Sequence, residues 1–158
     1  MSKSSKRYWL MKTEPDSYSI ENLERDGKTF WEGVRNYQAR NSLRDDFKVG
    51  DEVLIYHSST EPMGVAGLAR VCKAAYPDHF AFDKKSQYFD PKSKTENPTW
   101  FMVDVEFVAK FPTVVPLSEL KQARELEGMV LLQRGSRLSI QPVSAEQFAF
   151  IKKLGSKK

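Results

Sequence analysis

The chain has 158 residues, of which 40% are hydrophobic and 29% charged, and its formal net charge is +4. This length and composition fit one globular domain and exclude an intrinsically disordered chain, while the mild basic excess is compatible with a phosphate-bearing partner. The single cysteine, Cys72, excludes an internal disulfide. The sequence has no long apolar run and no secretory signal, so it predicts no membrane partner and a cytoplasmic location, or a nuclear one in a eukaryote.

The first half of the chain predicts strands and helices in alternation. A short apolar strand runs over Tyr8–Lys12, and Ser19 is a plausible N-cap for a short helix that ends at Gly27. A second helix is expected over Asn36–Phe47, because Tyr37, Leu43 and Phe47 tend to one side of it. A turn at residues 49–51 then leads into a strand over Glu52–His57.

Strands dominate the second half. Gly64–Lys73 is a strand whose small side chains allow close packing of another element, and Met102–Phe107 alternates between apolar and acidic residues. A helix is expected from Ser118 to about Glu127, and a strand over Arg137–Val143. Ser144 to Gln147 is a capping-box pattern that opens a final helix. The sequence therefore predicts an α+β domain with a curled sheet or a small barrel.

Signatures of enzymes are missing from the sequence. It has no Gly-rich phosphate loop, no G-x-G-x-x-G and no G-x-S-x-G elbow. Cys72 falls inside a predicted strand, where a buried small hydrophobe is commoner than a nucleophile. His57 is the one candidate acid or base, and its alternative is a histidine hydrogen-bonded at a strand end. We predict no catalytic residue, no metal site and no cofactor.

The segment from Phe30 to Asn41 is the richest in the chain in aromatic and amide side chains. Flat rings can stack on a nucleobase while Asn and Gln amides read its edge, so this segment is a candidate base site around Trp31. The alternative is that Trp31 and Tyr37 belong to the core and the polar residues cap a helix. Composition alone favours that alternative.

Basic and aromatic residues elsewhere suggest contacts to nucleic acid. Arg35, Arg40 and Arg44 can bind phosphates, or can pair with neighbouring carboxylates. Arg134–Arg137 forms a turn with two guanidinium groups and the Ser136 hydroxyl, and its backbone amides can help to bind an anion. Tyr88 and Phe89 are adjacent aromatics in a loop, where such residues either fill a core or cover a ligand.

Several ordered segments together resemble the EVE domain family. They cover residues 8 to 152, nearly the whole chain. They are Tyr8–Pro15, Trp31–Asn41, Val49–Asp51, Tyr56–Ser58, Tyr76–Asp83, Tyr88–Ser93, Trp100–Val105 and Arg134–Ser139. On this resemblance, residues 8–154 form the EVE domain, between a disordered basic tail over 1–7 and a C-terminal tail over 155–158.

The resemblance implies a PUA-like fold, a small and mostly antiparallel β-barrel with flanking helices. EVE domains are regarded as readers of modified bases and are similar to YTH domains, which hold a methylated adenine in an aromatic cage. By that analogy Trp31 is a cage wall, Lys12 and Thr13 end the first strand, and Tyr88 or Phe89 replaces the second wall. A pocket with fewer tryptophans and more amides could suit a modified cytosine instead.

We therefore predict a non-enzymatic, monomeric module that reads a modified base in DNA or RNA. The alternative is an enzyme that acts on a nucleotide-like small molecule in the same pocket. The expected base-binding residues are Lys12, Thr13, Trp31, Val34, Asn36, Tyr37, Tyr56, His57, Ser58, Tyr88 and Phe89. The expected phosphate-binding residues are Arg35, Arg40, Arg134, Ser136 and Arg137.

Overall fold

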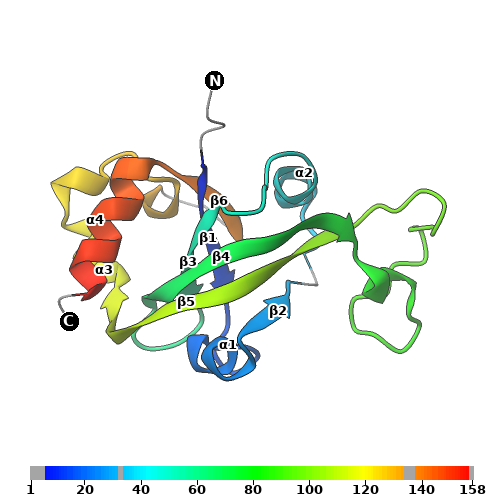
Figure 1. Cartoon of the computed structure of the whole chain (residues 1–158), viewed down its shortest axis with the longest axis horizontal. Coiled ribbons are helices and arrows are strands. Elements are labelled where there is room, and N and C mark those ends of the chain that lie inside the picture. Colours follow the sequence, from blue (N-terminus) through cyan, green and yellow to red (C-terminus); the bar gives the residue numbers. More distant parts are fainter. Residues whose placement is uncertain (1–5, 32–33, 134–137, 157–158) are drawn as a thin grey trace.

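Six strands form one mixed sheet in the computed structural model, which describes residues 6–31, 34–133 and 138–156. The strand order is β2-β5-β4-β3-β1-β6 (Figure 1). Only the β1–β3 pair is parallel among the described strands. The bounds are Tyr8–Thr13 for β1, Lys28–Phe30 for β2, Glu52–His57 for β3, Gly64–Pro77 for β4, Phe101–Pro116 for β5 and Ile140–Val143 for β6.

The expected barrel is wrong, because the sheet is open. β2 and β6 are its two edges, and in the described part of the chain they do not pair with each other. β4 and β5 are far longer than predicted, and four register shifts interrupt their ladder. Such irregularities bend and twist a sheet, so the long pair curves without closing it.

Helices cover both faces of the sheet, which explains why β1 and β3 read as continuous apolar runs. Trp9 and Met11 belong to one core cluster, under α1 (Ile20–Asp26) and α2 (Tyr37–Asp45). Leu10 points into a second cluster, with α3 (Leu117–Lys121) and α4 (Ala145–Ser156). Figure 1 shows α3 and α4 grouped at one end of the molecule, away from α1 and α2.

The predicted capping residues and close packing are confirmed. Ser19 caps α1 in a capping box with Asn22, and Ser144 and Gln147 form the reciprocal pair that opens α4. Gly67 lies where a Cβ would be 2.5 Å from the Ala109 carbonyl oxygen, so its position requires a residue without a side chain.

The helix predicted over 118–127 is shorter than expected. The structure has α3, then a turn, then two short 3-10 helices, η2 (Arg124–Leu126) and η3 (Val130–Leu132). Leu120 and Leu126 are both fully buried. In one continuous helix, residues six positions apart point about 120° away from each other, so the break lets both leucines reach the same core.

The segments predicted as tails make defined contacts where they are described. The Lys6 amine lies 3.0 Å from a carboxylate oxygen of Glu52, and the Arg7 amide donates to Asp51. At the other end, α4 continues through Gly155 and Ser156, because Gly155 is buried against the Phe111 ring, where a Cβ would clash. None of the described helices is long and apolar enough to cross a membrane.

A long connection between β4 and β5, which we call the 78–100 loop, extends beyond the sheet (Figure 1). It contains a 3-10 helix, η1 (His79–Phe82). Its base is closed by the Asp78 amide, which donates to the Trp100 carbonyl at 2.9 Å. This loop forms one wall of the site described next.

Candidate functional site

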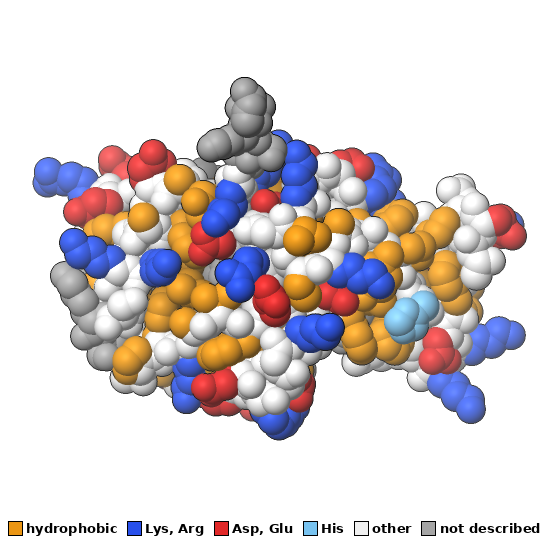
Figure 2. All heavy atoms as spheres, in the orientation of Figure 1, with side chains coloured by type: hydrophobic (Ala, Val, Ile, Leu, Met, Phe, Trp, Pro, Cys, Tyr) orange, Lys and Arg blue, Asp and Glu red, His pale blue; other side chains and the backbone are white. Residues whose placement is uncertain are grey.

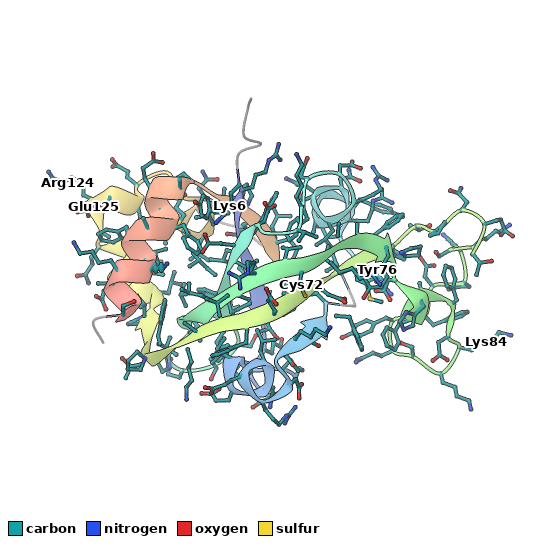
Figure 3. The ribbon with its side chains drawn as sticks, viewed as in Figure 1. Lys6, Cys72, Tyr76, Lys84, Arg124 and Glu125 are labelled. Atoms are coloured by element: carbon teal, nitrogen blue, oxygen red, sulfur yellow. The ribbon has the colours of Figure 1, made fainter. Side chains whose placement is uncertain are left out.

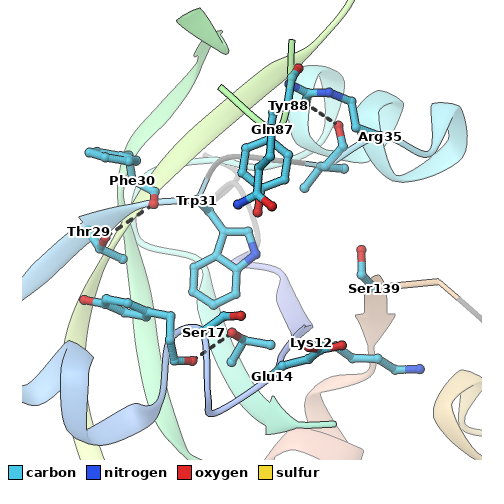
Figure 4. Close-up of a pocket in the computed structure, with 13 residues that line it drawn as sticks. Lys12, Glu14, Ser17, Thr29, Phe30, Trp31, Arg35, Gln87, Tyr88 and Ser139 are labelled. Carbon is cyan, nitrogen blue, oxygen red and sulfur yellow. Dashed lines mark hydrogen bonds between the residues drawn. The ribbon is translucent and has the colours of Figure 1, made fainter. Parts of the chain in front are cut away.

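A cavity of about 530 Å³ opens beside the ends of β1 and β2 (Figure 4). Its walls come from the chain after β1, from β2 and Trp31, from the segment before α2, and from the 78–100 loop. The lining residues are Lys12, Thr13, Glu14, Ser17, Tyr18, Thr29, Phe30, Trp31, Val34, Arg35, Gln87, Tyr88 and Ser139. Its volume falls within the range of about 300–1,000 Å³ that is usual for small-molecule sites.

Trp31 is the central wall of the cavity. Its amide donates to the Val103 carbonyl at 2.8 Å, which continues the β2–β5 ladder by one residue and fixes its backbone. The side chain is half-buried and packs on the core cluster under α1 and α2. In Figure 4 the indole projects into the cavity, with Gln87 and Tyr88 on one side of it and Ser17 and Glu14 on the other.

Hydroxyl groups and the half-buried Lys12 side chain make the lining polar. The Thr13 hydroxyl donates to the Tyr18 carbonyl at 2.8 Å, which holds the turn after β1. Burial and a hydrogen bond to Asp26 raise the pKa of Tyr18 to about 12. Burial also lowers the pKa of Lys12, whose amide donates to the Ser139 carbonyl across the sheet edge.

Arg35 ties the 78–100 loop to the segment before α2. Its guanidinium lies 3.0 Å from a carboxylate oxygen of Asp78, which is fully buried, and it also donates to the carbonyls of Val34 and Tyr88. Its charge faces the rings of Tyr88 and Trp100 at 5.5 and 5.3 Å. Arg35 was predicted to bind phosphate, but at least three of its five N–H donors are used inside the protein.

Trp100 and Tyr37 extend this contact to the start of α2. The Trp100 indole donates to Asp90, which lowers the pKa of that carboxyl, and its ring lies 4.9 Å from the ring of Tyr37. The Arg40 guanidinium lies 5.2 Å from the centre of the Tyr37 ring and donates a hydrogen bond to the Thr99 carbonyl. Arg40, also predicted to bind phosphate, therefore holds the end of the 78–100 loop.

The structure brings part of the predicted base site together. Lys12, Thr13, Trp31, Val34 and Tyr88 line the cavity, and Arg35 joins them. The other predicted base-binding residues do not line it: they are Asn36, Tyr37, Tyr56, His57, Ser58 and Phe89. Arg134, Ser136 and Arg137, predicted to bind phosphate, lie outside the described residues.

Each residue outside the cavity has another position in the fold. The Asn36 side chain caps α2 by accepting from the Ala39 amide at 2.9 Å, as the capping interpretation of this segment foresaw. Tyr56 is buried in the core cluster beneath α3 and α4, where burial raises its pKa. Ser58 bonds to the Thr13 carbonyl, and Phe89 and Tyr37 are exposed at the surface.

His57 is a structural residue at the start of α1. Its Nε2 accepts a hydrogen bond from the Ile20 amide at 3.1 Å, one of the helix amides that has no partner within the helix. This bond requires a neutral ring with its proton on Nδ1. Burial lowers the pKa of His57, although the negative charge of Glu21 acts in the opposite direction and raises it.

We expect the free energy of unfolding to fall as the pH drops below about 6.5, because the unfolded histidine binds a proton that the folded one resists. His57→Gln should lower stability at neutral pH and flatten its dependence between pH 7 and 5. Urea unfolding at several pH values measures both effects. His79→Gln is the matched control, since His79 is exposed. An unchanged pH slope in His57→Gln would contradict the assignment.

Sequence reasoning missed part of the lining. The residues are Glu14, Ser17, Tyr18, Thr29, Phe30, Gln87 and Ser139. Glu14 and Ser139 belong to two segments that resemble the EVE domain family, Tyr8–Pro15 and Arg134–Ser139, so the resemblance is the signal that could have found them. Thr29 and Phe30 belong to a three-residue strand that is too short for a periodic pattern. Among the described residues, no three His, Cys, Asp or Glu side chains gather as metal ligands.

The fold agrees with the comparisons to known proteins. The chain belongs to the EVE domain family, whose model matches residues 7–154. It is 45% identical to human thymocyte nuclear protein 1, over 98% of this chain and 76% of that protein.

Solved structures of similar chains share the fold. A hypothetical protein from Leishmania major is 50% identical, with a TM-score of 0.92 over 97% of this chain and 96% of that one. The human THYN1 protein is 44% identical, with a TM-score of 0.89 over 96% of this chain and 99% of that one. That human structure is a complex with DNA that contains 5-methylcytosine.

Proposed function

We propose that this protein binds DNA and holds a modified base, a methylated cytosine, in the cavity beside Trp31. The observation that carries the proposal is the cavity itself, where an indole face stands among hydroxyl, amide and charged groups. The complex of the human relative with 5-methylcytosine DNA supports the choice of partner. RNA, a monomeric state and a location in the cytoplasm, or in the nucleus of a eukaryote, stay predictions.

Stacking on Trp31 supplies the affinity in this proposal. A base must leave the duplex stack, or come from a single strand, to enter the cavity. Base–aromatic stacking is worth about 1–3 kcal/mol per base, so the indole can offset much of that cost. A methyl group on the base adds apolar contact of about 1 kcal/mol, a roughly fivefold preference.

Polar groups at the cavity rim would read the edge of the base. The Gln87 amide offers both a donor and an acceptor, and the Glu14 carboxylate can accept from an exocyclic amino group such as that of cytosine. The Lys12 amine, which lies 5.8 Å from the centre of the Tyr56 ring, supplies a positive charge near the site. Arg35 positions Tyr88 in this scheme, and Arg134, Ser136 and Arg137 are proposed to contact phosphates.

We expect Trp31→Ala to remove most discrimination between 5-methylcytosine and cytosine, bringing the ratio of dissociation constants from about five towards one. Fluorescence anisotropy with short labelled DNA of each kind, at fixed salt, measures it. Affinity for both DNAs should still weaken as salt rises, because phosphate contacts release counterions.

Trp31→Phe and Tyr37→Ala are the controls. Phe keeps a ring in the cavity, and Tyr37 is an exposed aromatic outside it, so both variants should keep the preference. Circular dichroism checks that Trp31→Ala is folded. The proposal fails if Trp31→Ala retains the wild-type ratio. A mass change in the oligonucleotide that depends on Lys12 or Glu14 would identify an enzyme instead.

A further inference from the structure

Three aromatic side chains form a surface just outside the cavity. Phe30 lines the cavity and is still 42% exposed, and its ring lies 5.4 Å from that of Phe80 and 6.3 Å from that of His79. His79 and Phe80, both in η1, are 4.4 Å apart. We call these three residues the aromatic strip. It begins at the cavity wall and continues onto the 78–100 loop.

Single exposed aromatics are common on protein surfaces, but contiguous ones mark binding sites. Within the strip, Phe30 and His79 are exposed and Phe80 is half-buried. Figure 2 shows hydrophobic side chains gathered around a histidine on the part of the surface formed by the 78–100 loop. The strip therefore offers flat ring surface to a partner, next to a cavity that also has a ring as its main wall.

Lysines near the strip offer positive charge to an anionic partner. In the 78–100 loop, the Asp78 carboxylate is paired with Arg35, whereas Asp83, Asp90 and the exposed Glu96 keep their negative charges. The exposed Lys84 and Lys85 make no ion pair with any described residue. Figure 3 shows Lys84 directed away from the loop into solvent.

One further lysine lies beside the strip on β2. Lys28 and Phe30 are two residues apart on this strand and both exposed, so they share one face. Glu106 and Asp104 lie opposite them on β5, but Glu106 pairs with Arg70, and Asp104 accepts a hydrogen bond from Tyr76. A strand of nucleic acid could thus place bases on the rings and phosphates near Lys28, Lys84 and Lys85.

We propose that the aromatic strip stacks the base next to the one held in the cavity. This inference rests on the proposed function and deepens it. When one base leaves the stack, its neighbour loses a stacking partner on the side that it faced. Because Phe30 belongs to both the cavity and the strip, the base on one side of the bound base can reach the strip directly. The Phe30 and His79 rings then replace the lost partner.

The test uses single-stranded DNA with one 5-methylcytosine, either intact or with an abasic spacer at its 5′ or 3′ neighbour. We expect the spacer on one side to weaken wild-type binding roughly tenfold, since stacking on an aromatic ring is worth about that factor. Phe30→Leu and His79→Ala should bind the intact DNA more weakly, roughly tenfold for Phe30→Leu. In these variants the abasic spacer should weaken binding little further.

Controls separate the strip from the cavity. Phe30→Tyr keeps the ring and should retain the wild-type coupling, and Val49→Ala changes an exposed apolar residue that is outside the strip. His79→Ala should keep the preference for 5-methylcytosine, because His79 does not line the cavity. A spacer cost that persists in Phe30→Leu and His79→Ala overturns the inference. If the spacer cost persists but the wild type still prefers 5-methylcytosine, the proposed function stands and only the inference fails. A wild type without that preference overturns the proposed function. A wild type that does not bind DNA overturns both the proposed function and the inference.

Discussion

Replacing Arg35 with alanine should lower the free energy of unfolding by about 3 kcal/mol, because it removes the guanidinium that faces a buried carboxylate. Asp78 is fully buried, and the Arg35 guanidinium lies 3.0 Å from it. Arg35 is itself 24% exposed, which places the effect at the low end for a buried pair. For a chain of this size, the expected loss in melting temperature is roughly 6–12 °C.

The same substitution should loosen one wall of the cavity. Arg35 donates to the Tyr88 carbonyl, so its loss should increase proteolysis within the 78–100 loop and weaken binding of both methylated and unmethylated DNA. Calorimetry and limited proteolysis measure the two effects. Arg44→Ala is the matched control, since it removes an arginine whose partner, Asp45, is exposed. Adding Asp78→Asn to Arg35→Ala should recover part of the stability, and a double variant that is less stable than Arg35→Ala would contradict the assignment.

Asp51→Ala should destabilise the protein by about 3 kcal/mol or more, because a single buried carboxylate satisfies three donors. It accepts from the amides of Arg7 and Lys48 and from the Trp9 indole at 2.9 Å. Asp51 is 2% exposed and Trp9 3% exposed, so water cannot replace the lost acceptor at the indole. Each orphaned buried donor costs about 1–3 kcal/mol.

Urea unfolding of three variants apportions this effect. Trp9→Phe removes the indole donor, although it also changes a ring that stacks on Phe47 at 4.2 Å. In the double variant with Asp51→Ala, the two losses should therefore sum to more than the measured total. Asp46→Ala, which removes an exposed carboxylate near Arg7, should have little effect. Fully additive losses would show that the Asp51–Trp9 bond contributes nothing.

Local patterns in the sequence predicted most of the helices and strands correctly. Ser19 and Ser144 are caps whose partners lie three residues away, so both could be found from the sequence. The open sheet could not be found from the sequence, because closure depends on whether the edge strands β2 and β6 pair. The resemblance to PUA-like proteins favoured a barrel. The turn that splits the helix predicted over 118–127 satisfies a tertiary demand, the burial of Leu120 and Leu126.

The candidate site was predicted where its residues are unusual in type and missed where its partners are distant in sequence. Composition alone favoured the core for Trp31, and the resemblance to EVE domains made it a predicted cavity wall. Arg35 could not be assigned, since its partner Asp78 lies 43 residues further along the chain. His57 was correctly predicted as a hydrogen-bonded strand-end histidine by its alternative interpretation, but the helix amide that it contacts, at Ile20, is again remote.

The 78–100 loop contains both residues that hold it in place and a residue that faces the cavity. Its two ends are fixed by Asp78 and Trp100, which both contact Arg35, and Tyr88 and Asp90 tie its middle to the same contacts. Gln87, which faces the cavity, lies in that intervening stretch and is exposed. Substitutions at this exposed position can therefore accumulate without unfolding the sheet. If the cavity holds a base as proposed, we expect exchanges at Gln87 to alter which base edge is favoured while the six strands stay unaltered.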